Sequence, residues 1–237
     1  MPRGYHAGVT RHEEQLPDPL PAEPLGVVAR WLEEAAQART QPNPNAMVLA
    51  TVDSQGRPSA RVVLCKDIRP QPGYVSFYSN YQSRKASDLA ANPHAAIVMH
   101  WDPMHRQVRI EGQVVQSTGA ESDSYFASRA WQSRIGAWAS QQSTPLASRA
   151  VLAAAVDEVA KRFGVPSPHQ SDETAPDPGV FIPRPPHWGG WHLWAQTVEL
   201  WVQGSARLHD RARWTRSLAR NATAFDAGSW SSTRLNP

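Results

Sequence analysis

The stretch MVLATVDSQGRPSARVVLCK, residues 47–66, decides the fold class of this chain. Residues 47–52 are mostly aliphatic and predict a strand, and residues 53–56, Asp-Ser-Gln-Gly, are typical of a turn. Residues 59–66 predict the second strand of a hairpin. Because parallel strands need a crossover of about a dozen residues or more, two strands joined by so short a turn run antiparallel.

More strand patterns extend outward from this hairpin. In residues 107–114, apolar side chains at even positions alternate with polar ones at odd positions, as in a half-buried strand. The other predicted strands are residues 74–79, 95–101, 191–196, 198–203 and about 211–215. Because most of these strands follow one another through short turns, we expect a mainly β fold, an antiparallel barrel with attached helices, rather than a βαβ fold.

Four helices are predicted, at residues 25–38, 83–91, 118–129 and 147–163. Ser83 is expected to cap the second, Thr118 and Glu121 to form a capping box on the third, and Gly164 to end the fourth. Residues 1–24 are polar and proline-bearing and predict an N-terminal arm. Residues 165–186 hold seven of the 21 prolines and predict a surface loop. We expect residues 25–237 to form a single domain.

Composition excludes several classes of protein. Lys and Arg outnumber Asp and Glu only 24 to 21 and are scattered, which suits a small anionic ligand and not a nucleic-acid partner. The lone Cys65 can form neither an internal disulfide nor a paired zinc ligand, so no metal site is expected. The longest apolar run, residues 150–156, is far too short for a membrane span, and no export signal is visible. We therefore expect a cytoplasmic protein.

Arg84 and Lys85 stand where a helix is predicted to begin. Two cations there oppose the positive end of the helix dipole, whereas free N–H groups together with cationic side chains form an anion site. A bound phosphate or a solvated surface pair explains them equally well. Arg61 and Lys66 flank an apolar strand on opposite faces, so a shared ligand requires a strand end or a bulge between them. A salt bridge at the barrel rim is the simpler explanation for Arg61.

Two further groups of polar residues stand out. Tyr125, Arg129 and Ser133 are spaced by four and would share one face if the helix continued that far, as a phosphate clamp or as a polar solvent face. In an extended segment Arg207, His209 and Arg211 would share one side. A histidine between two guanidinium groups favours its neutral form and faces an anion readily, although a lone histidine is more often structural.

Taken together, these segments resemble the pyridoxamine 5′-phosphate oxidase family over nearly the whole chain. The order and spacing of eight short motifs carry the resemblance. The motifs are Ala50-Thr-Val-Asp53, Arg61-Val-Val-Leu-Cys-Lys66, Ser83-Arg-Lys85, Arg106-Gln-Val108, Ile135-Gly-Ala-Trp138, Gln142-Ser143, Trp188-Gly-Gly190 and Arg207-Leu-His-Asp-Arg211.

The resemblance implies a fold, a cofactor and a site. The fold would be an FMN-binding split β-barrel, antiparallel and Greek-key-like, working as a homodimer with FMN at the subunit interface. The FMN contacts would be Arg61, Val62, Val63, Leu64, Cys65, Lys66, Tyr78, Ser79, Arg84, Lys85, Gln107, Gln142, Ser143, Trp201 and Arg211. The substrate contacts would be Lys66, Tyr125, Arg129, Ser133, Arg207, His209 and, from the arm, Tyr5. Arg207 and His209 would be the catalytic residues.

The implied activity is oxidation of pyridoxamine 5′-phosphate or pyridoxine 5′-phosphate to pyridoxal 5′-phosphate, with O₂ as acceptor and hydrogen peroxide as product. This is the chemistry of vitamin B6 biosynthesis and salvage. The protein's part would be to place the reacting carbon beside the flavin. Two alternatives remain: a split-barrel flavin oxidase of secondary metabolism, like the phenazine-pathway relatives, and a non-catalytic module that binds flavin or pyridoxal phosphate.

Overall fold

The structure, a computed structural model, describes residues 14–39, 41–170 and 175–237. Nine strands form one sheet: β1 (Ala46–Val52), β2 (Pro58–Leu64), β3 (Asp67–Arg69), β4 (Tyr74–Asn80), β5 (His94–Trp101), β6 (Arg106–Gln116), β7 (Trp188–Val202), β8 (Asp210–Thr215) and β11 (Ser231–Leu235). A separate hairpin comprises β9 (Leu218–Arg220) and β10 (Phe225–Ala227). The α-helices are α1 (Leu25–Ala38), α2 (Arg84–Ala91), α3 (Gly119–Ala127), α4 (Trp131–Ala139) and α5 (Arg149–Phe163).

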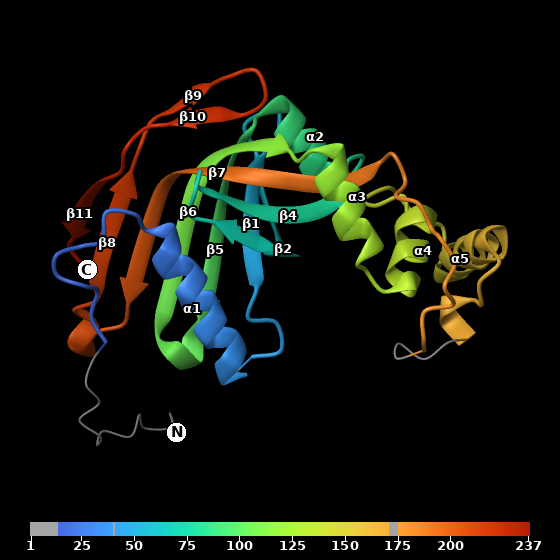
Figure 1. Cartoon of the computed structure of the whole chain (residues 1–237), viewed down its shortest axis with the longest axis horizontal. Coiled ribbons are helices and arrows are strands. Elements are labelled where there is room, and N and C mark those ends of the chain that lie inside the picture. Colours follow the sequence, from blue (N-terminus) through green and yellow to red (C-terminus); the bar gives the residue numbers. More distant parts are fainter. Residues whose placement is uncertain (1–13, 40, 171–174) are drawn as a thin grey trace.

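The main sheet is antiparallel and curved. Its strand order is β11-β8-β7-β6-β5-β1-β2, with β4 paired to β7 and β3 paired to β4. All strand pairs in the described part of the chain are antiparallel. The sheet curls into an open half-barrel, while α3, α4 and α5 gather beyond one end of β7 (Figure 1). The predicted fold class is confirmed, and its first hairpin is β1–β2.

β7 is the longest strand and joins the two ends of the molecule (Figure 1). The prediction of two strands, at 191–196 and 198–203, is wrong, because β7 runs for 15 residues without a break. In place of a break, β7 shows a shift in its pairing register with β6, which falls between Glu111 and Gly112 of β6. The sequence also missed β3, β9, β10 and β11, since strands of three to five residues are too short to show a clear periodicity.

Gly112 allows this register shift. A Cβ at Gly112 would lie 1.9 Å from the carbonyl oxygen of Trp194, and that backbone atom can move only if β7 moves. We therefore expect Gly112→Ala to lower the free energy of unfolding by about 3 kcal/mol or more in urea titrations. Gly119→Ala is the control, because nothing lies within 4 Å of a Cβ there. Equal destabilisation by both substitutions would contradict this account of the bulge.

The half-barrel encloses the larger of two hydrophobic clusters. Trp101 and Trp214 are among its fully buried side chains, and the Trp214 indole donates to the carbonyl of Pro21 at 2.8 Å. Leu16, inside the predicted arm, is buried in this cluster, and its N–H donates to Asp210 at 2.7 Å. The near end of the arm therefore packs on the barrel, whereas residues 1–13 lie outside the described residues.

The smaller cluster joins α3, α4 and α5 to the start of β7. Its buried members are Phe126, Trp131, Ile135, Val156, Ala160, Val165, Ile182 and Trp188. The proline-rich stretch contributes Ile182 to this cluster, so its described part is anchored over α4 rather than loose on the surface. No helix in the described ranges is long and apolar enough to cross a membrane.

Candidate functional site

A cavity of about 1030 Å³ lies among β2, β4, the start of α2 and the α3–α4 region. Fourteen predicted site residues line it, which we call the cavity group: Arg61, Val62, Val63, Leu64, Lys66, Tyr78, Ser79, Arg84, Lys85, Tyr125, Arg129, Ser133, Gln142 and Ser143. Cys65 is the exception within 61–66: its thiol is buried and donates to the carbonyl of Asp67. Burial raises the pKa of that thiol to about 12, so it stays protonated.

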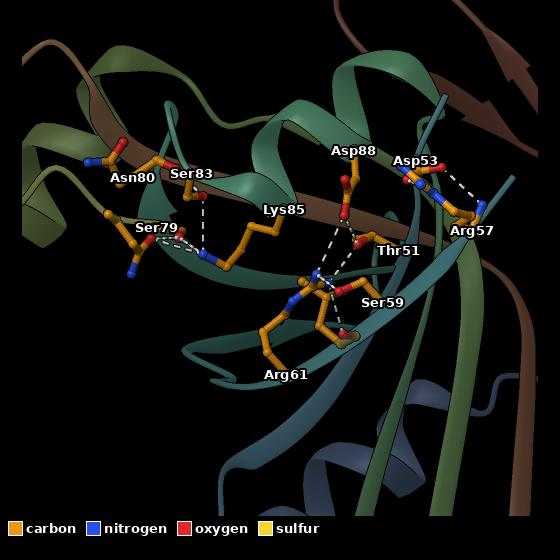
Figure 2. Close-up of polar contacts among 12 residues, drawn as sticks. Thr51, Asp53, Arg57, Ser59, Arg61, Ser79, Asn80, Ser83, Lys85 and Asp88 are labelled. Atoms are coloured by element: carbon orange, nitrogen blue, oxygen red, sulfur yellow. Dashed lines mark hydrogen bonds and ion pairs between the residues drawn. The ribbon is translucent and has the colours of Figure 1, made fainter. Parts of the chain in front are cut away.

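Lys85 is a buried cation that has only neutral partners among the described residues. Its ammonium donates to Ser79 Oγ at 2.9 Å and to Ser83 Oγ at 3.1 Å (Figure 2). It also donates to Gln142 Oε1 at 2.9 Å. Burial, with a smaller contribution from nearby Arg61, lowers the pKa of Lys85 to about 8. A buried charge without a counter-charge is costly, so an anion that enters the cavity would be strongly attracted.

The start of α2 adds backbone donors to the same place. Ser83 occupies the N-cap position as predicted, but it does not cap the helix, because its hydroxyl donates to the carbonyl of Asn80. The first helical hydrogen bond is donated by Ala86 to Ser83, so the N–H groups of Arg84 and Lys85 precede the bonded turns. Free N–H groups and two cationic side chains therefore meet at this wall of the cavity.

The sequence left two environments open for Arg61, a salt bridge at the barrel rim and a ligand cavity, and Arg61 has both. Its guanidinium lies 3.5 Å from the Asp88 carboxylate and donates to Thr51 Oγ1 at 2.6 Å and to Ser59 Oγ at 2.9 Å (Figure 2). The predicted rim salt bridge exists, and the same side chain lines the cavity. Lys66 reaches the cavity as well because β2 ends at Leu64, which removes the opposite-face restriction.

Tyr125, Arg129 and Ser133 line the cavity, but not as one helical face. The predicted helix over 118–129 ends at Ala127, and α4, which the sequence did not predict, begins at Trp131. The capping box of Thr118 and Glu121 is present as predicted. A bend between two helices brings the three side chains to the cavity. Their spacing of four in the sequence is therefore not the cause of their proximity.

Arg129 is a second, half-buried cation of the cavity. Its guanidinium lies 4.6 Å from the centroid of the Trp188 ring, and its Nη1 is buried with no hydrogen-bond partner in the described chain. Burial lowers the pKa of Arg129. Tyr125 stacks on Tyr78 at 3.8 Å, and Lys66 Nζ lies 5.7 Å from the Tyr125 ring. This part of the cavity thus offers an aromatic wall and unsatisfied positive charge.

The remaining predicted residues form a second set, the distal group: Gln107, Trp201, Arg207, His209 and Arg211. None of them lines the cavity. Gln107, Trp201 and Arg211 are register neighbours across β6, β7 and β8, and the ring of His209 lies 4.5 Å from that of Trp201. Arg211 donates to the buried carboxylate of Glu199 at 2.8 Å.

Arg207 is not part of an extended segment, and that prediction is wrong. Ser205–Arg207 forms a 3₁₀ turn in which Ala206 and Arg207 have φ angles of 50° and 64°. The turn is tight because Gly204 packs against the chain ahead of it: a Cβ on Gly204 would lie 1.9 Å from the carbonyl oxygen of Leu208. Arg207 therefore projects from a strained exposed loop rather than from a strand face.

The two groups lie at opposite ends of β7. Gly190, which pairs with Tyr78, is near its start, whereas Trp201 is near its end. At about 3.3 Å per residue, roughly 35 Å of strand separates them. One chain therefore does not bring the distal group to its own cavity. Tyr5, the remaining predicted contact, lies outside the described residues.

Sequence reasoning missed several residues in or behind the cavity wall, of which three bear on its chemistry. Trp188 lines it, although the tryptophans were expected mainly to pack the core. Thr51 and Asp88 are buried behind Arg61 and hold it. One signal was available for Asp88, since it is an acidic residue on the buried face of α2, where a charge requires a partner. Across the described ranges, no cluster of three or more His, Cys, Asp or Glu could hold a metal ion.

Two family models match the chain. Residues 32–163 match the model described as pyridoxamine 5′-phosphate oxidase. Residues 188–237 match the C-terminal dimerisation region of pyridoxine 5′-phosphate oxidase. The second match contains β7, β8 and the whole distal group except Gln107.

Individual relatives match over most of their length. The pyridoxine/pyridoxamine 5′-phosphate oxidase of Burkholderia vietnamiensis is 47% identical over 215 residues, covering 91% of this chain and 89% of the relative. The crystal structure of PhzG from Burkholderia lata, in complex with tetrahydrophenazine-1-carboxylic acid, has 31% identity and a TM-score of 0.76, covering 93% and 95% of the two chains. A pyridoxamine 5′-phosphate oxidase-related, FMN-binding protein from Nostoc punctiforme shares the fold, with 17% identity, a TM-score of 0.61, and 90% and 96% coverage.

Proposed function

The chain belongs to the pyridoxamine 5′-phosphate oxidase family, and from this premise we propose that it oxidises pyridoxamine 5′-phosphate and pyridoxine 5′-phosphate to pyridoxal 5′-phosphate. The cofactor is FMN. The acceptor of the proposed reaction is O₂, and its second product is hydrogen peroxide. This activity would serve vitamin B6 biosynthesis or salvage.

The cavity group fits FMN. Lys85 with its neutral partners, Arg84 and the N–H groups at the start of α2 form a set of donors suited to a phosphate dianion. A cavity of about 1030 Å³ is large enough for a flavin together with a second small molecule. When bound, FMN would supply the redox chemistry, a two-electron transfer from the substrate to O₂. The task of the chain is to bind, orient and exclude competing reactions.

A second group of cationic and polar side chains in the same cavity is the observation that supports the choice of substrate. Arg129 keeps a buried Nη1 without a partner in the described chain, and it lies on a different element from Lys85. Lys66, Tyr125 and Ser133 line the cavity beside it. The buried Lys85 and the half-buried Arg129, on separate walls, fit two phosphate esters, one on the flavin and one on the vitamer. In this proposal Arg129 and Lys66 fix the substrate phosphate and thereby position its reacting carbon.

We assign Arg207 and His209 to the site of a second copy of the chain. The match of residues 188–237 to a dimerisation region supports this assignment, as does their distance from the cavity of their own chain. β2 is an edge strand without a fully buried residue, and Val62 on it is 64% exposed beside the cavity. A partner subunit placed there would cover apolar surface and deliver the distal group. Arg207 would then orient the pyridine ring, and His209 would assist proton movement.

A second candidate function is oxidation of a reduced phenazine precursor. The structure of PhzG with tetrahydrophenazine-1-carboxylic acid favours it, because the two folds agree at a TM-score of 0.76. Such a ligand carries one carboxylate and no phosphate. It would therefore leave the group of Arg129, Lys66, Tyr125 and Ser133 without the dianion that this group fits. A flavin or pyridoxal phosphate binding module without catalysis is the third possibility.

Anaerobic bleaching of the flavin tests these candidates. We expect pyridoxine 5′-phosphate or pyridoxamine 5′-phosphate to bleach the bound flavin, and readmitted O₂ to restore the colour with release of hydrogen peroxide. Arg129→Met should raise the KM for the phosphorylated vitamers at least tenfold, the size of one charge-assisted hydrogen bond. Bleaching by tetrahydrophenazine-1-carboxylic acid alone would favour the second candidate, and a yellow protein that no candidate bleaches would favour the binding module.

A further inference from the structure

Asp88 is a buried carboxylate next to the cavity that the proposed function does not use. It lies on α2 close to Lys85, is 4% exposed and is not among the cavity-lining residues. Its Oδ2 accepts a hydrogen bond from Thr51 Oγ1 at 2.6 Å and lies 3.5 Å from Arg61 Nη2. Figure 2 shows the carboxylate pointing toward Thr51 and Arg61 and away from the Lys85 ammonium.

The hydroxyl of Thr51 connects the two charged groups. Thr51 is 1% exposed, and its single hydroxyl proton goes to Asp88. An oxygen lone pair of the same hydroxyl is thereby free to accept from Arg61 Nη1 at 2.6 Å. The negative charge of Asp88 thus sets the direction of a short chain of hydrogen bonds that ends on the Arg61 guanidinium.

Other acceptors besides Thr51 and Asp88 surround the same side of the Arg61 guanidinium. Nη1 also donates to the carbonyl of Leu49 at 3.2 Å, and Nη2 donates to Ser59 Oγ at 2.9 Å. Both terminal nitrogens are therefore held by β1, β2 and α2. The guanidinium cannot rotate without breaking several hydrogen bonds, so the part of it that meets the cavity is fixed before a ligand arrives.

We propose that Asp88 and Thr51 are positioning residues for FMN, which hold the Arg61 guanidinium in the orientation that the cofactor requires. The inference rests on the proposed function, because it takes Arg61 to be an FMN contact. It opposes a simple electrostatic expectation. Removing the Asp88 carboxylate makes the cavity more positive, which by charge alone would tighten the binding of an anion. If Asp88 positions Arg61, its removal weakens FMN binding instead. The sign of the change in FMN affinity therefore distinguishes positioning from simple electrostatics.

The test measures FMN binding to the full-length apoprotein by flavin fluorescence. Asp88→Asn and Thr51→Val should each raise the dissociation constant about tenfold, the size of one charge-assisted hydrogen bond. Thr51→Ser keeps the hydroxyl and should stay within about twofold of the unsubstituted protein. The matched control is Asp53→Asn, which removes an exposed ion pair with Arg57 at the turn of the same hairpin and should leave FMN affinity unchanged (Figure 2).

A double-mutant cycle separates positioning from general stability. In an Arg61→Met background, Asp88→Asn should cause less than about a twofold further change in FMN affinity, because the group that it positions is gone. The same tenfold loss in that background, or unchanged or tighter FMN binding by Asp88→Asn alone, would overturn the inference. If Asp88→Asn does not fold, the comparison of Thr51→Val with Thr51→Ser decides, since equal affinities would overturn it.

The failure of the inference is distinguishable from that of the proposed function. An unsubstituted apoprotein that takes up no FMN would overturn the proposed function and this inference with it. Normal FMN uptake with no effect of Asp88→Asn and Thr51→Val would overturn the inference alone.

Discussion

Replacing Lys85 with methionine is expected to weaken FMN binding at least a hundredfold and to leave riboflavin binding within about threefold. Lys85 is 7% exposed and is surrounded by Ser79, Ser83 and Gln142, all of which are neutral. The phosphate of FMN would provide the counter-charge that the described part of the chain does not supply. Riboflavin lacks that phosphate and should not depend on the ammonium.

The same substitution should abolish a pH dependence. Burial and nearby Arg61 lower the pKa of Lys85 to about 8, and only the protonated amine attracts the phosphate. FMN affinity should therefore be nearly constant between about pH 6.5, above the second phosphate pKa near 6, and about pH 8. Above about pH 8 the free protein loses the proton, so affinity should fall by up to tenfold per pH unit. Riboflavin and the Lys85→Met variant should show no such fall.

Fluorescence titration of the apoprotein with each flavin provides the measurement. Lys161→Met is the control, because Lys161 lies exposed in the last turn of α5, away from the cavity. It should bind both flavins like the unsubstituted protein. An equal loss of riboflavin binding in Lys85→Met would mean that Lys85 supports the shape of the cavity rather than the phosphate.

The contrast between Lys85 and Tyr125–Ser133 shows what sequence can predict here. A helix start is a local event, marked by Ser83 and by the spacing of apolar residues, so the position of Lys85 at the cavity end of α2 followed from nearby residues. The end of α3 at Ala127 has no such marker. No Gly or Pro follows it, and the bend before Trp131 arises because Phe126 and Trp131 are both buried in the smaller cluster. The position of this bend is therefore determined by long-range packing, which a local sequence pattern does not contain.

The environment of Arg61 lies between these two cases. Once the turn at 53–56 is recognised, the hairpin register follows, and it places Leu49 opposite Arg61 and Thr51 opposite Ser59. Three of the partners of Arg61 were thus within reach of sequence reasoning. The place of Asp88 on the buried face of α2 indicated that it needs a partner, but that the partner is Arg61 was out of reach, because the packing of α2 on β1 is a tertiary contact. The positive φ angles of Ala206 and Arg207 were equally hidden, since neither residue is a glycine.

Two impaired variants are expected to restore activity when they are combined in one dimer. Arg129→Met damages the cavity group and, through its effect on KM, should lower kcat/KM at least tenfold, and Arg207→Met damages the distal group and should lower kcat/KM at least a hundredfold, both measured well below the KM. If each site takes its cavity group from one subunit and its distal group from the other, a mixed dimer has one site with both defects and one site with none. By this symmetry a purified mixed dimer should have about half of the unsubstituted activity.

Co-expression of the two chains with different affinity tags, followed by purification on both, gives the mixed dimer. The control combines Arg129→Met with Lys85→Met, which both damage the cavity group, so that each site of the mixed dimer carries one defect and activity stays low. The separation of the groups along β7 is the physical reason for this difference: about 35 Å of strand lies between them, and none of the distal group lines the cavity of its own chain. Low activity in both mixtures would place the two groups of one site on the same chain and contradict the shared-site proposal.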